Sequence, residues 1–140
     1  MDGRITLSLL QAARAYRVRS ARLLARIGLY PGQDALLKLL EGGPLTMGQA
    51  AEALSIQPPT VTKMVSRLAA AGLVQTEIMD RDRRKVSVSM TDAARDRVEE
   101  IEAIWQELEE EALKDVEPEP LRVGLAALAR NLSKHNGSAS

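Results

Sequence analysis

Basic side chains gather at one point near the middle of the chain. Arg81, Arg83, Arg84 and Lys85 lie within five positions, between two short runs in which apolar residues alternate. Guanidinium and ammonium groups bind phosphate oxygens, and arginine also suits a narrow, strongly negative groove. Nucleophilic or acid–base catalysis has no evident need of this arrangement. The cluster therefore favours a surface that meets a polyanion.

The residues that most chemistry depends on are scarce. The chain has no cysteine, which excludes disulfides and thiolate metal sites, and its one histidine, His135, lies close to the C-terminus. Asp80 and Asp82 stand inside the basic cluster, where we expect a turn and not a cleft. We predict a protein that is not an enzyme, with no catalytic residues, no metal ligands and no cofactor.

The net charge of zero conceals a strong segregation of charge along the chain. The first thirty residues carry many arginines against the single acid Asp2, and the stretch from Glu99 to Glu119 is acidic apart from Lys114. We expect basic and acidic regions on one molecule, with the basic ones as candidates for a polyanion. The acidic run is more simply interpreted as a solvated helix face than as a partner surface.

Helical periodicity and chain breakers divide the first half of the chain. Residues 1–30 predict one long helix ending at Gly28, and a short buried helix follows over residues 35–40, before Gly42-Gly43-Pro44. Thr46-Met47-Gly48-Gln49 has the pattern of a capping box, because a threonine hydroxyl and a glutamine three residues on can each satisfy an N–H at a helix start. A helix should therefore begin at this threonine.

A further helix should begin at Pro58-Pro59, because proline is tolerated in a first helical turn, where its missing N–H costs no hydrogen bond. Val61, Met64, Val65 and Leu68 follow the spacing of a buried face and leave polar and basic residues exposed. Residues 73–78 and 86–90 alternate as two strands of a hairpin, with the basic cluster at the tip.

The sequence of the C-terminal third predicts two more helices, whose apolar side chains a single chain would not fully bury. A long helix should follow the N-cap candidates Thr91-Asp92 and break at Pro118 and Pro120, and leucines from Leu121 onward predict a last helix before a frayed tail. Apolar stripes at both ends of the chain need each other or a second copy to be covered. The chain shows neither a membrane span nor a signal-peptide pattern, so we expect a cytoplasmic protein.

A capped helix, a short turn, a second helix with a polar and basic face, and a hairpin with a cationic tip make up a winged helix-turn-helix. Such a helix fits the major groove of B-DNA, and an arginine-bearing wing fits the adjacent minor groove. The fold class is therefore mainly α with a small β-hairpin wing, flanked by N- and C-terminal helices. We expect residues 1–140 to form a single domain, with flanking helices in 1–30 and 92–140 and the DNA-binding region in 31–91.

The sequence resembles the MarR-type transcriptional regulators over nearly its whole length. "GLYPGQDALLKLL" resembles the second helix of that family, "TMGQAAEALSIQPPTVTKMVSRLAAAGLV" its helix-turn-helix, and "DRDRRKVSVSMT" its wing. The family's wing has D-x-R and then Leu-Thr at a fixed spacing, which is matched here by Asp82, Arg84 and Met90-Thr91, with methionine in place of leucine.

The resemblance implies a homodimer that sets two winged modules on a pseudo-palindromic DNA operator. It implies that the helices in 1–30 and 92–140 are N- and C-terminal dimerisation helices. It implies that Arg84 enters the minor groove and that Asp82 orients it, by pairing with a basic side chain such as Arg67. The full set of expected DNA-binding residues is Gln57, Pro58, Pro59, Thr60, Thr62, Lys63, Arg67, Asp82, Arg83 and Arg84.

The sequence leaves two functional questions open. Many family members are repressors released by a small aromatic or anionic effector, and Tyr16, Arg17, Tyr30 and Trp105 are conceivable lining residues, although packing is the simpler interpretation of each. The second question is whether the winged helix binds DNA at all, since the fold also serves as a protein-interaction module. The basic wing favours a dimeric, sequence-specific DNA-binding regulator.

Overall fold

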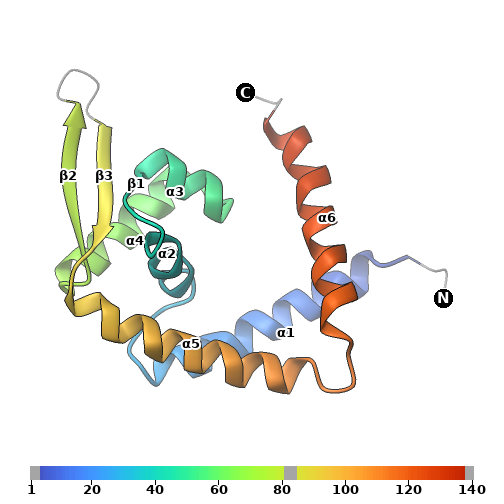
Figure 1. The fold of residues 1–140 in the computed structure, drawn as a ribbon. Coiled ribbons are helices and arrows are strands. Elements are labelled where there is room, and N and C mark those ends of the chain that lie inside the picture. The colour runs from blue at the N-terminus through green and yellow to red at the C-terminus, as the bar shows by residue number, and fades with distance from the viewer. Residues whose placement is uncertain (1–3, 81–84, 138–140) are drawn as a thin grey trace. The chain divides into compact units, whose positions relative to one another are not determined.

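The computed structural model describes residues 4–80 and 85–137, in which helices predominate and the strands form one small sheet (Figure 1). The chain divides into two compact units, Met1–Leu108 and Glu109–Ser140. In chain order the elements are α1 (Thr6–Ala25), α2 (Gln33–Leu40), β1 (Leu45–Thr46), α3 (Met47–Leu54), α4 (Pro58–Ala70), β2 (Val74–Asp80), β3 (Lys85–Met90), α5 (Ala93–Ala112) and α6 (Pro118–Gly137).

The connection from α1 to α2 is a tight turn built on two glycines. The chain leaves α1 at Ala25, slightly before the expected end at Gly28, which has a φ of +73°. Gly32, with a φ of +98°, directly precedes α2 and donates its N–H to the Asp34 carboxylate. Positive φ strains residues with a Cβ, so glycine suits both positions. A Cβ at Gly32 would also lie 2.7 Å from Cε of Met64 in α4, so this turn packs closely against that helix.

The helix-turn-helix begins with the capping box predicted from the sequence. The N–H of Gln49 donates to Oγ1 of Thr46, and the N–H of Thr46 donates to Oε1 of Gln49, as a reciprocal cap requires. Ser55, in the left-handed conformation, ends α3. Gln57 then precedes α4, which starts with Pro58 and Pro59 in its first turn. The expectation that these prolines begin a helix is confirmed.

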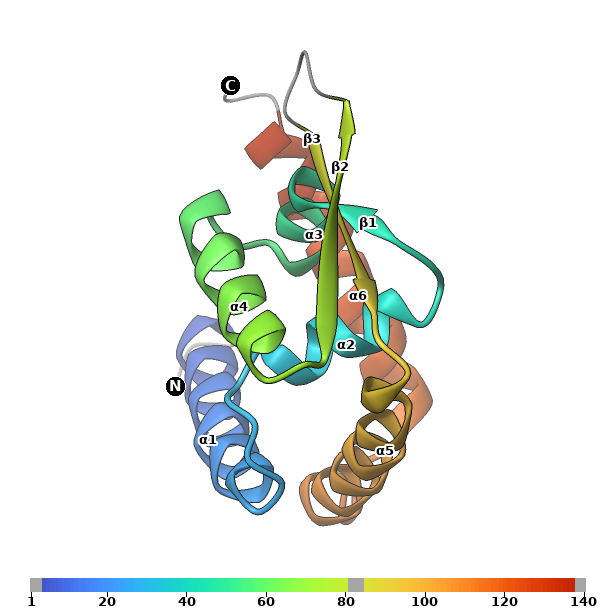
Figure 2. The ribbon, with the colours of Figure 1, turned by 90° about the vertical axis from the view of Figure 1, so that its left-hand side faces the viewer.

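The sheet has three antiparallel strands in the order β1-β3-β2. β2 and β3 form the predicted hairpin, whose two strands run side by side and project past α3 and α4 (Figures 1 and 2). β1 was not predicted; it pairs Leu45 with Val88 and Thr46 with Ser87. The start of α3 is thereby attached to the base of the wing.

One hydrophobic core joins α2, the helix-turn-helix, the base of the sheet, the end of α1 and α5 as far as Leu108. Leucines dominate it, and Leu23, Leu24, Leu36 and Leu37 have no exposed surface. By contrast, much of the apolar surface toward the start of α1 is uncovered, with Leu7 64% and Leu10 61% exposed. The end of α1 therefore packs into the core of its own chain, whereas its start does not.

The C-terminal helices differ in detail from the sequence prediction. α5 begins at Ala93, directly after Thr91-Asp92 as expected, but the Thr91 hydroxyl donates to the carbonyl of Gly72 and so joins the two ends of the hairpin region. Pro118 does not merely break a helix, since it is the first residue of α6. α6 extends to Gly137, so it includes the first half of the segment "HNGSAS" (residues 135–140), which the sequence predicted to be a frayed tail.

The mainly α fold class with a β-hairpin wing is confirmed. Within the described residues, no helix combines the length and apolar character needed to cross a bilayer.

Candidate nucleic-acid interface

α4 has one apolar face and one polar face. Val61, Val65 and Leu68 are buried, as their i, i+4, i+7 spacing predicted, and they anchor the helix on the core. The structure leaves exposed every α4-region residue that the sequence assigned to DNA, namely Gln57, Pro58, Pro59, Thr60, Thr62, Lys63 and Arg67. The core thus fixes α4 while its polar face stays open to a partner.

None of the first four positions of α4 offers a partner an unbonded backbone N–H. Pro58 and Pro59 have no N–H, and the N–H groups of Thr60 and Val61 both donate to the carbonyl of Gln57, at 2.9 and 3.2 Å. The side chain of Gln57 makes no capping hydrogen bond. The Thr62 hydroxyl donates to the Pro58 carbonyl at 3.1 Å.

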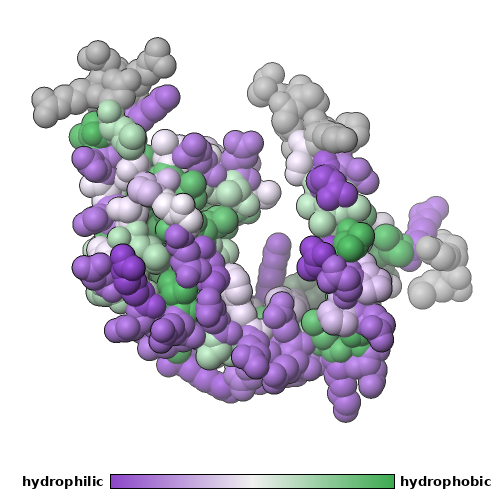
Figure 3. Space-filling model, in the orientation of Figure 1, coloured by the Kyte–Doolittle hydropathy of each residue, from purple (hydrophilic) through white to green (hydrophobic). Residues whose placement is uncertain are grey.

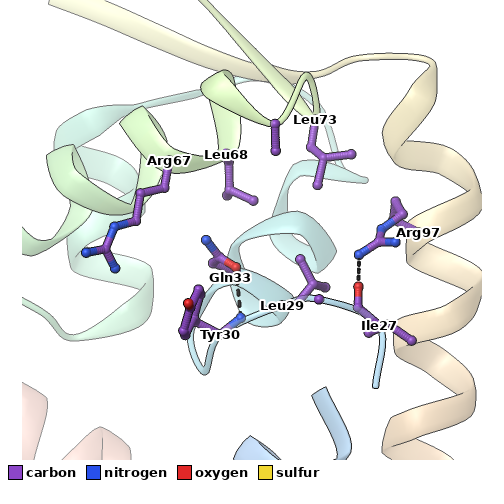
Figure 4. A pocket seen from close by; sticks show the side chains of 10 residues that line it. Ile27, Leu29, Tyr30, Gln33, Arg67, Leu68, Leu73 and Arg97 are labelled. Atoms are coloured by element: carbon purple, nitrogen blue, oxygen red, sulfur yellow. Dashed lines mark hydrogen bonds between the residues drawn. The ribbon is translucent and has the colours of Figure 1, made fainter. Parts of the chain in front are cut away.

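Arg67 lies on the flank of α4 that faces the turn before α2. Its guanidinium carbon is 5.9 Å from the centroid of the Tyr30 ring, within the range of a cation–π contact (Figure 4). Tyr30 is itself 65% exposed, so this contact lies at the surface. Arg67 therefore touches the α1–α2 turn, a contact that the sequence did not predict.

The wing is described up to its last paired residues. Asp80 in β2 pairs with Lys85 in β3, after an irregularity between Ile78 and Asp80. The expected DNA-binding residues Asp82, Arg83 and Arg84 lie outside the described residues, as does Arg81. Lys85 is exposed, and Ile78 and Met79 beside it are 63% and 66% exposed. The described part of the hairpin thus carries a cation and uncovered apolar side chains toward its tip.

A cavity of about 510 Å³ opens between the α1–α2 turn, the end of α4 and the start of α5 (Figure 4). Arg67 lies at one side of it and Arg97 at the other. Arg97 donates to the carbonyl of Ile27 and pairs with Glu100 at 3.2 Å, while its Nε is buried and has no acceptor among the described residues. The lining residues are Ile27, Gly28, Leu29, Tyr30, Gln33, Arg67, Leu68, Ala71, Leu73 and Arg97.

The sequence anticipated only part of this cavity. Tyr30 was a conceivable lining residue and does line it, whereas Tyr16, Arg17 and Trp105 are not among its lining residues. The sequence did not predict that Arg97 lines the cavity. Arg97 is one of many charged residues on an acidic helix, and its spacing does not set it apart from the others. Gln33 gave no signal either, although it accepts the N–H of Tyr30 at 2.8 Å.

A buried carboxylate connects α2 to α5. Asp34 is 7% exposed; its Oδ1 accepts the N–H of Gly32 and its Oδ2 accepts Nε1–H of Trp105, both at 2.9 Å. Lys38, one turn further along α2, lies over the Trp105 ring at 5.9 Å. Trp105 is therefore a packing residue of the α2–α5 contact, which agrees with the simpler interpretation of its role.

Lys38 strengthens the same contact through two carboxylates. Its Nζ is 2.6 Å from both Glu102 of α5 and Glu41. The hydrogen bond to Glu102, followed by that to Glu41, raises the pKa of Lys38 above 10.5. A raised pKa means that this contribution to stability is fully present at neutral pH and is lost only in strongly alkaline solution, as the pH rises through the raised value.

Replacing Asp34 by asparagine should lower the free energy of unfolding by about 1–3 kcal/mol, because one of two buried N–H donors then meets an amide NH₂ and loses its acceptor. Urea titration followed by circular dichroism measures the loss, and the emission of Trp105, the only tryptophan, should shift to longer wavelength. Asp92→Asn is the matched control, since that side chain is fully exposed and its ion pair within the described part of the chain is with Arg95. Equal stability of the two variants would contradict the assigned role of Asp34.

The described residues bring together no group of three or more His, Cys, Asp or Glu side chains that could hold a metal ion.

Known transcriptional regulators resemble this chain in sequence and in fold. A sequence model described as MarR family matches residues 34–85, from the start of α2 to the start of β3. The chain is 34% identical over 110 residues to the uncharacterized HTH-type transcriptional regulator YwoH of Bacillus subtilis, covering 78% of this chain and 80% of YwoH.

Two solved structures share the fold over almost the full length. Bordetella bronchiseptica BpsR, whose DNA binding is described as regulated by 6-hydroxynicotinic acid, superposes with a TM-score of 0.79 at 24% identity, covering 95% of each chain. A point mutant of MarR from E. coli, complexed with operator DNA, gives a TM-score of 0.78 at 18% identity and covers 91% of this chain and 93% of that one.

Proposed function

Because the chain belongs to the MarR family and is a DNA-binding transcriptional regulator, we propose that it binds a pseudo-palindromic operator as a homodimer and represses transcription until a small effector releases it. One observation carries this proposal: α4 is fixed on the core by Val61, Val65 and Leu68 and presents an exposed polar and basic face. A helix held in this way can enter the major groove without a cost in ordering.

The proposed contacts divide between α4 and the wing. Gln57, Pro58, Pro59, Thr60, Thr62 and Lys63 would face the major groove, and their exposure supports this. Arg83 and Arg84 would follow the minor groove, with Asp82 orienting Arg84, on the strength of the family resemblance and of the adjoining β2–β3 ladder. Arg67, beside Tyr30, would contact phosphate at the margin of the interface.

Dimerisation through the terminal helices is supported by uncovered apolar surface. On α6, Leu121, Leu125 and Leu132 are 41%, 47% and 62% exposed, and apolar side chains reach the surface along this helix (Figure 3). Soluble chains seldom leave such surface bare unless it binds something. We therefore keep residues 1–30 and 92–140 as the proposed dimerisation helices around a DNA-binding region of residues 31–91.

The cavity beside Tyr30 supports control by an effector. It is lined by apolar side chains and two guanidinium groups, which suits a small aromatic or anionic molecule such as the 6-hydroxynicotinic acid that regulates BpsR. Because Arg67 of α4 and Arg97 of α5 both line it, an occupant would contact the recognition helix directly. A regulator of this kind would act in the cytoplasm, beside the DNA that it binds.

Selection of bound sequences from a random duplex library tests the proposal. The expected result is a pseudo-palindromic consensus bound with a steep dependence on salt, because lysine and arginine release counterions from the phosphates they neutralise. Lys63→Gln should bind the consensus more weakly and with a salt slope smaller by about one. Failure to enrich any sequence would reject specific DNA binding and favour the protein-interaction module.

A further inference from the structure

We propose that the outward face of α4 reads thymine by its 5-methyl group, with Pro59 and Thr62 as specificity-determining residues. The inference rests on the proposed function, since it requires α4 to lie in the major groove. It adds the chemical class of base that α4 selects.

The backbone at the start of α4 leaves little to bind a phosphate. Where a helix N-terminus binds a phosphate, its unbonded N–H groups make the contact. Here two of those groups are absent, at Pro58 and Pro59, and two donate to the Gln57 carbonyl. Contact with DNA at this point therefore depends on side chains.

Three of those side chains, Pro58, Pro59 and Thr62, offer a partner mainly apolar atoms. Pro58 and Pro59 present only ring methylenes, and both are exposed. The Thr62 hydroxyl hydrogen is committed to the Pro58 carbonyl, which leaves the methyl group and the oxygen lone pairs of Thr62 for a partner. Positions 59, 62, 63 and 66 share the side of α4 away from Val61, Val65 and Leu68, as the 100° step of a helix requires.

Donors for guanine are few on this face. The most frequent specific contact to guanine is a bidentate arginine on its O6 and N7. Within α4, all of whose residues are described, the cations are Lys63 and Arg67, and Arg67 is held over the Tyr30 ring. That leaves Lys63, the amide of Gln57 and the hydroxyls of Thr60 and Ser66. Glutamine pairs preferentially with adenine, and a single hydroxyl cannot make the bidentate contact that distinguishes guanine.

The major groove displays one apolar group, the 5-methyl of thymine. Proline rings and a threonine methyl complement it by excluding water from both surfaces. A Thr62 oxygen that only accepts hydrogen bonds also suits the amino group of adenine and disfavours the acceptors of guanine. T·A pairs are therefore the base pairs that fit this surface.

The test removes one methyl group from each side of the contact. Each thymine of the selected half-site is replaced in turn by deoxyuridine, which lacks only the 5-methyl, and dissociation constants are measured at one fixed salt concentration. On the protein side, Thr62→Ser deletes a methyl and keeps the hydroxyl bonded to Pro58, and Pro59→Ala removes a ring. Thr76→Ser in β2, also exposed but off α4, is the matched control.

At a contacted thymine the parent protein and Thr76→Ser should bind the uracil duplex about fourfold more weakly, the value of one buried methyl. Thr62→Ser or Pro59→Ala should bring that ratio close to one, by weakening the thymine complex alone. A consensus without thymine under α4, or a ratio that neither α4 variant changes, would overturn the methyl readout and leave specific DNA binding standing. Absence of any consensus would instead remove the proposed function itself.

Discussion

The Leu125→Glu variant is expected to sediment as a single chain of 15.2 kDa and to bind the operator about two to four orders of magnitude more weakly than the parent. Leu121, Leu125 and Leu132 share one face of α6 and are partly exposed. A glutamate there would have to be buried in the proposed dimer without a partner. Loss of the dimer removes the linkage that makes binding of the second half-site intramolecular.

Arg130→Glu is the control for this variant. It lies five positions further along α6, about 140° around the helix, and it changes the net charge by two units where Leu125→Glu changes it by one. If added negative charge alone weakened DNA binding, Arg130→Glu would bind the operator more weakly than Leu125→Glu. Analytical ultracentrifugation and operator titration measure both properties, and a dimeric Leu125→Glu protein with full affinity would contradict dimerisation through this face.

Leu36→Ala should lower the free energy of unfolding by about 2–5 kcal/mol, because Leu36 is fully buried and its truncation leaves a cavity in the core that supports α4. Leu39, on the same helix, is 37% exposed, and Leu39→Ala should cost much less. Urea unfolding of both variants at one protein concentration separates the two, since the stability of a dimer depends on concentration. Equal losses of unfolding free energy in the two variants would contradict the assignment of Leu36 to the core and of Leu39 to the surface.

Local chemistry made much of the helix-turn-helix predictable. The capping box at Thr46 and the prolines at the start of α4 act within a few residues, so sequence spacing alone locates them. The buried face of α4 was predictable for the same reason, because a helix repeats its neighbours every three or four positions.

Features that depend on distant partners were not predictable. β1 has only two residues and exists because it pairs with Val88 and Ser87, more than forty positions away. The contacts of Arg67 with Tyr30 and of Trp105 with Asp34 likewise join separate elements, and neither leaves a spacing pattern in the sequence. Pro118 shows a different limit, since a proline both ends one helix and begins the next, and only the structure shows that it begins α6.

In the proposed complex, two copies of α4 held by one dimer read two half-sites on the same face of DNA. Inserting five base pairs between the selected half-sites tests this arrangement, since the insertion turns one half-site by about half a helical turn. We predict that affinity falls to that of a duplex with a single half-site, although both half-site sequences are intact. Unchanged affinity after the insertion would contradict a rigid dimer and show that each chain binds its half-site alone.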